Sequence, residues 1–196
     1  MQPYNPRMSL RRLLSLSALL LSVALPGLAA TPGVADHAPD FTLSTPNGAS
    51  LQLSSLTARG RVVLIVLRGY PGYQCPYSQQ QFNDFQQAAA QFAALNTQVL
   101  FIYPGASANL ASVASAFAPT KSLPDNVHLV IDPDFTVTNQ YGLRWNATGE
   151  TAYPSTFVIE TDGSVYSAKI GKSHGDHATA ADTIAAVNAD TSAVKH

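Results

Sequence analysis

The sequence predicts an α/β protein in which helices flank a central mixed β-sheet. Apolar, β-branched runs at 62–67 and 98–103 are typical of strands buried on both faces, and an amphipathic helix follows each. This β-α-β-α order indicates parallel strands covered by helices. A tight turn at 161–164 then joins two further strands, 155–160 and 165–170, which we expect to pair antiparallel.

A small β-hairpin is expected as an N-terminal extension of the sheet, because 40–43 and 50–53 alternate in polarity around Pro46-Asn47-Gly48. Residues 54–58 suit one helical turn. The helix after the first buried strand should run over 76–95. Its predicted apolar face consists of Phe82, Phe85, Ala89, Phe92 and Leu95.

The remaining elements are, in order, a helix at 107–117, a strand at 127–131, a short helix at 133–141 and a loop at 143–153. Asp176 is the expected cap of a final helix that ends near Ala189. We place a single domain at 31–190 and a frayed C-terminal tail at 191–196, since single cores commonly span this length.

Residues 1–30 have the pattern of a secretory signal peptide, in which three arginines precede an apolar run at 13–25 and small residues up to Ala30. The apolar run is short for a membrane span. An uncleaved anchor is the alternative, because Leu28 suits cleavage after Ala30 poorly. We expect an exported protein, periplasmic or secreted, with no membrane attachment after cleavage.

The mature chain keeps eight of the eleven basic residues and all twelve acidic ones, which gives a net charge of −4. We therefore expect no nucleic-acid partner. His174, Asp176 and His177 are possible metal ligands, but their loop spacing is weak evidence. We predict no metal or cofactor, but an Asp176 that caps its own loop and histidines that face solvent.

Cys75 is the single cysteine, so it has no partner for an internal disulfide. Pro76 suits the first position of a helix, which places Cys75 at the N-cap. Unpaired backbone donors and the helix dipole there favour thiolate over thiol. A lone cysteine often packs as a small buried hydrophobe. The strand, glycine-containing loop, Cys-Pro pair and helix together favour redox chemistry instead.

Several motifs in this order resemble the thioredoxin fold over 34–188, and more narrowly its alkyl hydroperoxide reductase and thiol-specific antioxidant (peroxiredoxin) branch. The matching segments are 38–43, 60–64, Cys75, 132–133, 141–143 and 156–163. The resemblance implies that Cys75 attacks a peroxide, becomes a sulfenic acid and is returned to the thiol by a second thiol. Pro154 occupies the place of the thioredoxin cis-proline, so we expect a cis bond there. The same resemblance implies that the loop after the last hairpin strand lies near the rim of the Cys75 pocket, which Lys172 and His174 could then reach.

The chain departs from the family pattern at Arg68 and Gly72, where the family usually has proline and threonine, and at Pro154, where it has an arginine. We hypothesise that Arg68 folds back to stabilise the thiolate and to polarise a peroxide oxygen, although an exposed strand-end arginine is the alternative. Arg144 is a second candidate, unless it packs on Trp145.

Ser78 lies one turn into the predicted helix, where its hydroxyl is close enough to hydrogen-bond the sulfur of Cys75. An ordinary first-turn serine is the alternative. The sequence Cys-Pro-Tyr-Ser also resembles the Cys-Pro-Tyr-Cys of glutaredoxin-like proteins without the second cysteine.

These observations favour a one-cysteine peroxidase whose substrate is a hydroperoxide and whose reductant is an external thiol, either a small molecule or a redoxin. One alternative is a thiol-disulfide oxidoreductase that forms mixed disulfides with a partner. Another is a thioredoxin-fold binding module without catalysis. The sequence leaves the oligomeric state open.

Overall fold

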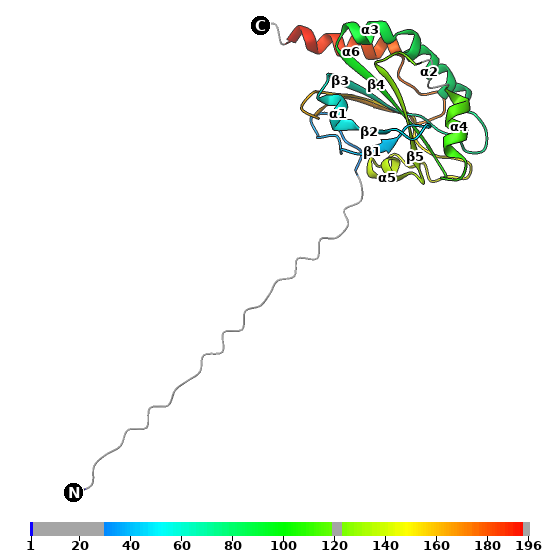
Figure 1. The fold of residues 1–196 in the computed structure, drawn as a ribbon. Coiled ribbons are helices and arrows are strands. Elements are labelled where there is room, and N and C mark those ends of the chain that lie inside the picture. Colours follow the sequence, from blue (N-terminus) through cyan, green and yellow to red (C-terminus); the bar gives the residue numbers. More distant parts are fainter. Residues whose placement is uncertain (2–29, 119–122, 194–196) are drawn as a thin grey trace.

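A computed structural model of the chain describes residues 1, 30–118 and 123–193 (Figure 1). The predicted signal peptide, apart from residues 1 and 30, lies outside the described residues, as do residues 194–196 of the predicted tail. Among the helices of the described part, none is long and apolar enough to cross a membrane.

The sheet is mixed and has seven strands in the order β2-β1-β5-β4-β3-β6-β7 within the described part of the chain. Their bounds are β1 Thr42–Ser44, β2 Ser50–Gln52, β3 Arg61–Val66, β4 Thr97–Gly105, β5 Val127–Pro133, β6 Ser155–Ile159 and β7 Val165–Ile170. The central strands β3, β4 and β5 are parallel. Strands β6 and β7 pair antiparallel, and the β1–β2 hairpin extends the opposite edge, as predicted.

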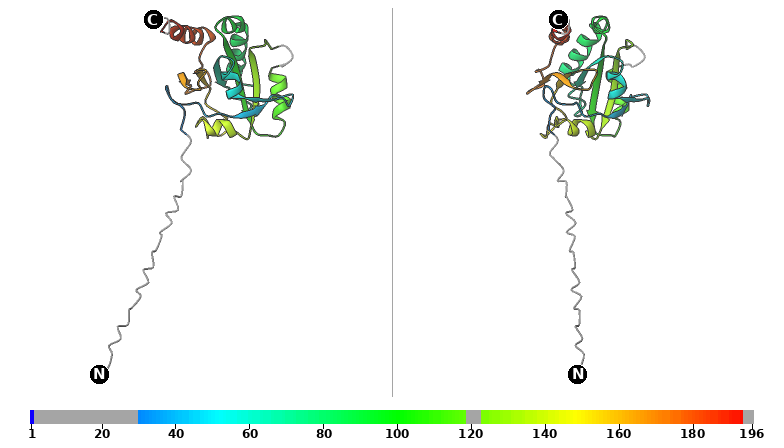
Figure 2. Two further views of the ribbon diagram at one scale, coloured as in Figure 1. Left: turned by 60° about the vertical axis from the view of Figure 1, so that its left-hand side comes forward. Right: turned by 90° about the vertical axis from the view of Figure 1, so that its left-hand side faces the viewer.

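Helices cover both faces of this sheet (Figures 1 and 2). Their bounds are α1 Leu53–Thr57, α2 Pro76–Gln87, α3 Ala89–Ala94, α4 Leu110–Phe117, α5 Thr136–Gln140 and α6 Ala180–Ala193. Alternate residues of β3 point to opposite sides. Val63 and Ile65 pack in the core under α2, α3, α4 and α6, whereas Val62 and Leu64 pack in the core with α1 and α5.

The predicted helix at 76–95 is two helices, because the backbone leaves helical geometry at Ala88 (φ −85°, ψ 2°). The break accompanies a parallel stack of Phe85 on Phe92, with ring centroids 5.5 Å apart. Seven residues of continuous helix rise about 10.5 Å, so the break brings the two rings together in the core. Asn96, with φ 50°, ends the pair, as predicted.

The helices α4 and α5 begin three residues later than predicted, because left-handed residues precede them: Asn109 before α4, and Asp134 and Phe135 before α5. The buried carboxylate of Asp132 accepts hydrogen bonds from the first turn of α5, including the backbone N–H of Thr138 at 2.8 Å. Asp132 therefore fixes the start of α5.

The predicted cap of the last helix is wrong. Asp176 instead accepts a hydrogen bond from the Lys172 backbone N–H and pairs with Lys169 at 3.0 Å, which closes the loop at 171–176 on itself. Thr179 is the cap: its Oγ1 accepts from the backbone N–H of Asp182 and donates to that residue's carboxylate.

Candidate functional site

Cys75 lies at the N-cap of α2, one loop after β3, as predicted. Its backbone carbonyl accepts from Gln79, while its side chain makes no capping hydrogen bond. The residue is a free cysteine and only 1% exposed, so its thiol is shielded from bulk water.

The loop at 67–74 curls because of Gly69, whose φ of 77° suits glycine. A Cβ at this position would meet the carbonyl oxygen of Pro104 at 2.0 Å. Tyr70 N–H donates to the same carbonyl at 3.4 Å. The loop therefore lies directly against the end of β4.

Arg68 is buried, with 1% of its side chain exposed, so the interpretation as an exposed strand-end residue is wrong. Its Nε donates to Glu150 Oε2 at 2.8 Å and its Nη2 to the Gly149 carbonyl at 3.0 Å. Its Cζ lies 5.1 Å from the centroid of the Tyr73 ring. Nη1 is also buried, and it has no hydrogen-bond partner among the described residues.

The guanidinium stays charged in this setting. Burial lowers the pKa of Arg68, but the hydrogen bond and charge of Glu150 outweigh it, with smaller contributions from Tyr73 and Cys75, so the pKa is raised overall.

Glu150 joins Arg68 to His174, and the sequence reasoning missed its role. Its two carboxylate oxygens lie 2.9 and 3.0 Å from Nε2 of His174. Burial raises the pKa of Glu150, but the hydrogen bonds from Arg68 and His174 and their charges bring it below its ordinary value. One sequence feature could have pointed to Glu150: it is the only acidic residue between Asp134 and Glu160.

The expectation that both histidines face solvent is wrong. His174, on the loop at 171–176, contacts Glu150, and its ring also meets Trp145 edge-on, with centroids 5.3 Å apart. His177 lies elsewhere, with Nδ1 3.1 Å from Oε1 of Gln81. The described residues include no group of three or more His, Cys, Asp or Glu side chains arranged to hold a metal ion.

Ser78 is buried, and its Oγ accepts a hydrogen bond from the backbone N–H of Arg68 at 3.3 Å. It therefore links the loop that carries Arg68 to the first turn of α2. Its predicted bond to the sulfur of Cys75 is not among the hydrogen bonds of the described residues, so that role stays a prediction.

Arg144 donates hydrogen bonds within its own loop, the loop that leads into β6. Its Nη1 donates to the carbonyls of Trp145 at 2.7 Å, Glu150 at 3.0 Å, and Thr151. Its Cζ lies 4.0 Å from the centroid of the Phe135 ring. The guanidinium thus holds the loop that presents Glu150.

The predicted cis bond at Pro154 is wrong, since none of the described peptide bonds is cis. The Pro154 carbonyl accepts from Gly171 N–H at 2.8 Å, which continues the β6–β7 pairing one residue beyond Ser155 and Ile170. A trans bond suits this extended entry into β6.

Tyr103 and Gln74 form a further contact that the sequence reasoning missed. The Tyr103 hydroxyl donates to Oε1 of Gln74 at 3.0 Å. Burial raises the pKa of Tyr103 to about 12, so the hydroxyl remains protonated at neutral pH. The residue before Cys75 is thereby tied to β4.

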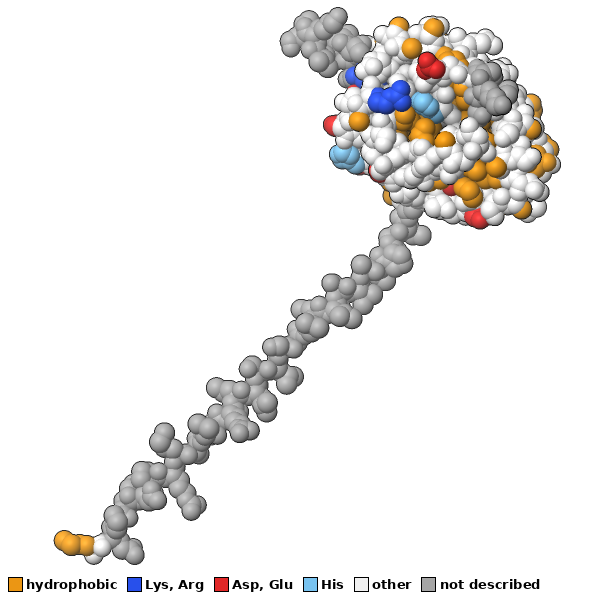
Figure 3. All heavy atoms as spheres, in the orientation of Figure 1, with side chains coloured by type: hydrophobic (Ala, Val, Ile, Leu, Met, Phe, Trp, Pro, Cys, Tyr) orange, Lys and Arg blue, Asp and Glu red, His pale blue; other side chains and the backbone are white. Residues whose placement is uncertain are grey.

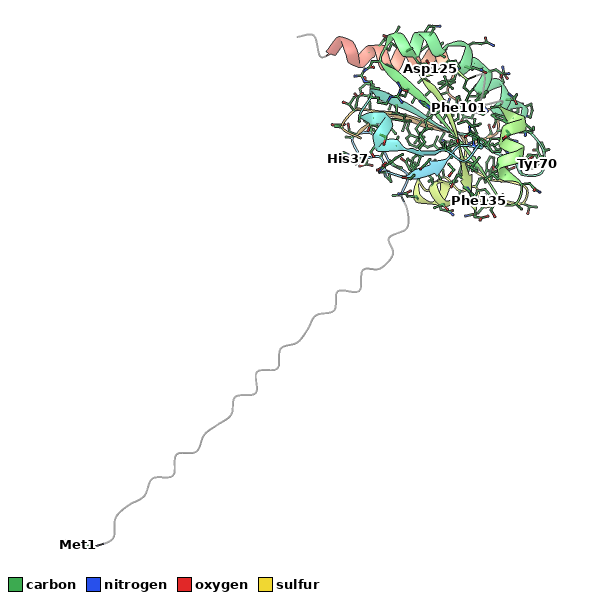
Figure 4. All side chains as sticks on the ribbon, viewed as in Figure 1. Met1, His37, Tyr70, Phe101, Asp125 and Phe135 are labelled. Atoms are coloured by element: carbon green, nitrogen blue, oxygen red, sulfur yellow. The ribbon has the colours of Figure 1, made fainter. Side chains whose placement is uncertain are left out.

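A cavity of about 380 Å³ adjoins the site, with Glu150 in its wall. Its lining is mainly apolar and includes Tyr70, Pro71, Leu110, Val113 and Phe135. Figure 4 labels Tyr70 and Phe135 at the lower right of the molecule, and Figure 3 shows hydrophobic side chains gathered in that region in the same orientation.

A mixed sheet with a cysteine at the N-cap of the helix after its first core strand defines a thioredoxin-fold redox protein. The model of the AhpC/TSA family matches residues 34–168. The chain belongs to that family, and the resemblance noted in the sequence is confirmed. The family match places the chain among the peroxiredoxin-like, thiol-dependent peroxidases.

Solved structures of peroxiredoxins are similar to this chain. Peroxidoxin BcpB from Mycobacterium tuberculosis has a TM-score of 0.66 and 26% identity, with 81% of this chain and 97% of that chain covered. A reduced 2-Cys peroxiredoxin from Plasmodium vivax has a TM-score of 0.65 and 13% identity, with 83% and 84% covered.

The mitochondrial 2-Cys peroxiredoxin from Plasmodium falciparum has a TM-score of 0.62 and 18% identity, with 82% of this chain and 97% of that chain covered. The two Plasmodium structures support the fold alone, and they confirm the predicted thioredoxin-like architecture. A search of curated protein sequences finds no match.

Proposed function

We propose that this chain is an exported one-cysteine peroxidase that reduces hydroperoxides through Cys75 and is recycled by an external thiol. One observation carries the proposal: the buried, charged guanidinium of Arg68, on the loop that leads to Cys75, keeps Nη1 without a partner among the described residues. A buried donor of this kind is costly unless a ligand satisfies it, and a peroxide oxygen is a suitable acceptor.

The first step is attack of the Cys75 thiolate on one oxygen of the hydroperoxide. A sulfur–oxygen bond forms, the oxygen–oxygen bond breaks, and the departing oxygen takes a proton to leave as an alcohol or as water. Sulfur is oxidised to a sulfenic acid and the peroxide is reduced. Arg68 stabilises the negative charge that develops on the departing oxygen.

The second step uses an external thiol, because Cys75 is the chain's single cysteine. The thiol sulfur displaces the sulfenic oxygen as water and forms a mixed disulfide with Cys75. A second thiol attacks that disulfide, which releases the Cys75 thiol and a disulfide of the two reductant molecules. The reductant is a small-molecule thiol or a redoxin.

Consumption of hydrogen peroxide by the mature protein in the presence of dithiothreitol tests the proposal. We expect turnover by the wild type and none by Cys75→Ser. Activity that survives Cys75→Ser would remove the mechanism. The thiol-disulfide oxidoreductase alternative depended on the Cys-Pro-Tyr-Ser sequence and on a cis bond at Pro154, and that bond is trans. Incubation with glutathione disulfide is the comparison reaction. A mixed disulfide that forms while peroxide is not consumed would favour the alternative.

Export is proposed from residues 1–30 alone. Expression of the full chain, followed by N-terminal sequencing of the protein outside the cytoplasm, should give a mature start near Thr31. Recovery of only the uncleaved chain in membranes would favour the anchor alternative.

A further inference from the structure

We infer that Glu150, itself held by His174, is a positioning residue for the peroxide reaction: it orients the Arg68 guanidinium so that Nη1 stays free for a peroxide oxygen. This inference rests on the proposed function. The three residues come from three separate loops, which precede α2, β6 and α6. We call them the Arg68–Glu150–His174 chain.

The hydrogen bonds that Nε and Nη2 of Arg68 donate determine where Nη1 points. A guanidinium is planar and presents its N–H donors in a fixed geometry. Nε is held by the Glu150 carboxylate and Nη2 by the Gly149 carbonyl, two adjacent acceptors on one loop. The Tyr73 ring covers the guanidinium at 5.1 Å. Nη1 is therefore fixed in direction while remaining without a partner in the described structure.

The carboxylate of Glu150 is restrained in turn by His174. The terminal torsion of a glutamate side chain is broad, so a carboxylate bonded on one side is free to rotate. His174 Nε2 contacts both oxygens, at 2.9 and 3.0 Å. Loss of this contact leaves Glu150 held by Arg68 alone and allows the pair to shift together.

The loop that carries His174 is itself constrained. A Cβ on Gly171 would meet the carbonyl oxygen of Asp176 at 2.2 Å and that of Pro154 at 2.9 Å. The Asp176 carboxylate also accepts from the Lys172 backbone N–H. These close approaches, together with the Trp145 ring beside His174, hold the imidazole over Glu150.

The test separates positioning from simple stabilisation by comparing two reactions of the same thiol. Oxidation by hydrogen peroxide needs the oriented guanidinium, whereas alkylation by iodoacetamide involves no peroxide oxygen. His174→Leu removes the contact with Glu150 without touching Arg68. His174→Gln keeps a side-chain N–H able to donate to the carboxylate. Ser173→Ala is the control in the same loop.

We expect His174→Leu to slow peroxide oxidation of Cys75 by about 10-fold, the lower end of the losses seen at metal sites when a residue that orients a ligand is removed. Alkylation should change by less than about two-fold, since the thiol itself is untouched. His174→Gln should recover most of the peroxide rate, and Ser173→Ala should match the wild type. Thermal unfolding of each variant checks that it is folded.

Glu150→Asp is a second, independent variant, because it keeps the charge and moves the carboxylate by one methylene. It should slow peroxide oxidation more than His174→Leu does. Wild-type rates in both variants overturn the inference, as does an equal fall in oxidation and alkylation. If the wild type itself is not oxidised by peroxide, the proposed function fails instead.

Discussion

The Nε of Arg68 donates to Glu150 Oε2 at 2.8 Å although the two residues are 82 positions apart in the sequence. This ion pair joins the loop that leads to Cys75 with the loop that enters β6. Both partners are largely removed from water, with side-chain exposures of 1% and 14%. At the end of the sheet that carries Cys75, a contact between loops therefore adds to the local motif around the cysteine.

Arg68 and Arg144 should behave differently when each is replaced by methionine. Arg68→Met removes the buried donor on the loop before Cys75, so peroxide oxidation should slow by about 100-fold, as when one charge-stabilising donor is lost. Arg144→Met removes bonds to loop carbonyls and should lower the free energy of unfolding by about 2 kcal/mol. Stopped-flow oxidation and urea unfolding measure the two effects. A larger rate loss in Arg144→Met would reassign the thiolate partner.

Replacement of Ser78 tests the link between α2 and the Arg68 loop. Ser78→Ala leaves the buried backbone N–H of Arg68 without its hydroxyl acceptor and should cost about 1–3 kcal/mol of unfolding free energy. Ser78→Thr keeps the hydroxyl and should cost less. Urea unfolding gives both values, and equal stability of the alanine and wild-type proteins would show that this bond contributes nothing.

The Arg68–Glu150 pair should make stability depend on pH in the acid range. The pKa of Glu150 is lowered from its ordinary value of 4.5 in the folded protein. The ionised carboxylate therefore adds to the free energy of unfolding above pH 4.5, and this stabilisation is lost as the pH falls through the folded pKa. At neutral pH, Glu150→Gln should cost about 3 kcal/mol, because it leaves a buried charge uncompensated.

The measurement is urea unfolding of wild type and Glu150→Gln at about pH 7 and about pH 3. The stability gap between the two proteins should narrow towards the acid pH, because protonation of Glu150 removes the charge that glutamine lacks. A gap of the same size at both values would mean that the charge of Glu150 does not stabilise the fold.

Gly69→Ala should disturb the loop more than Gly72→Ala. Both glycines have positive φ, at 77° and 105°. A Cβ on Gly69 meets the Pro104 carbonyl oxygen at 2.0 Å, whereas one on Gly72 meets nothing within 4 Å. Gly69→Ala should lower the free energy of unfolding by about 1–3 kcal/mol more than Gly72→Ala does. Urea unfolding of the two variants measures the difference. Equal costs would indicate that the loop moves freely away from β4.

The sheet and most helices were predictable because their signals are local. Continuous β-branched runs such as β3 indicate strands buried on both faces, and Pro76 marks the start of the helix after Cys75. The break at Ala88 was missed, since apolar spacing alone does not reveal the stack of Phe85 on Phe92. Thr179 and Asp182 form a capping pair that the sequence does contain, and it was overlooked in favour of Asp176.

The site was predictable only in part. Cys75 and Arg68 could be proposed as site residues because the strand, loop and helix around them are contiguous. Glu150 and His174 lie in loops without periodicity, and their relation to Arg68 depends on how β6 and β7 bring those loops to the same end of the sheet. The cis bond expected at Pro154 came from resemblance, and the pairing of its carbonyl with Gly171 was not visible in the sequence.

The most direct test of the account is a single-turnover oxidation of the mature protein. Hydrogen peroxide is added without reductant, a carbon nucleophile that reacts with sulfenic acids is present, and the intact protein is analysed by mass spectrometry. The account predicts one adduct per chain, located at Cys75, in proportion to the peroxide consumed, and none in Cys75→Ser. A Cys75 thiol that stays unmodified and titratable while peroxide persists would contradict it.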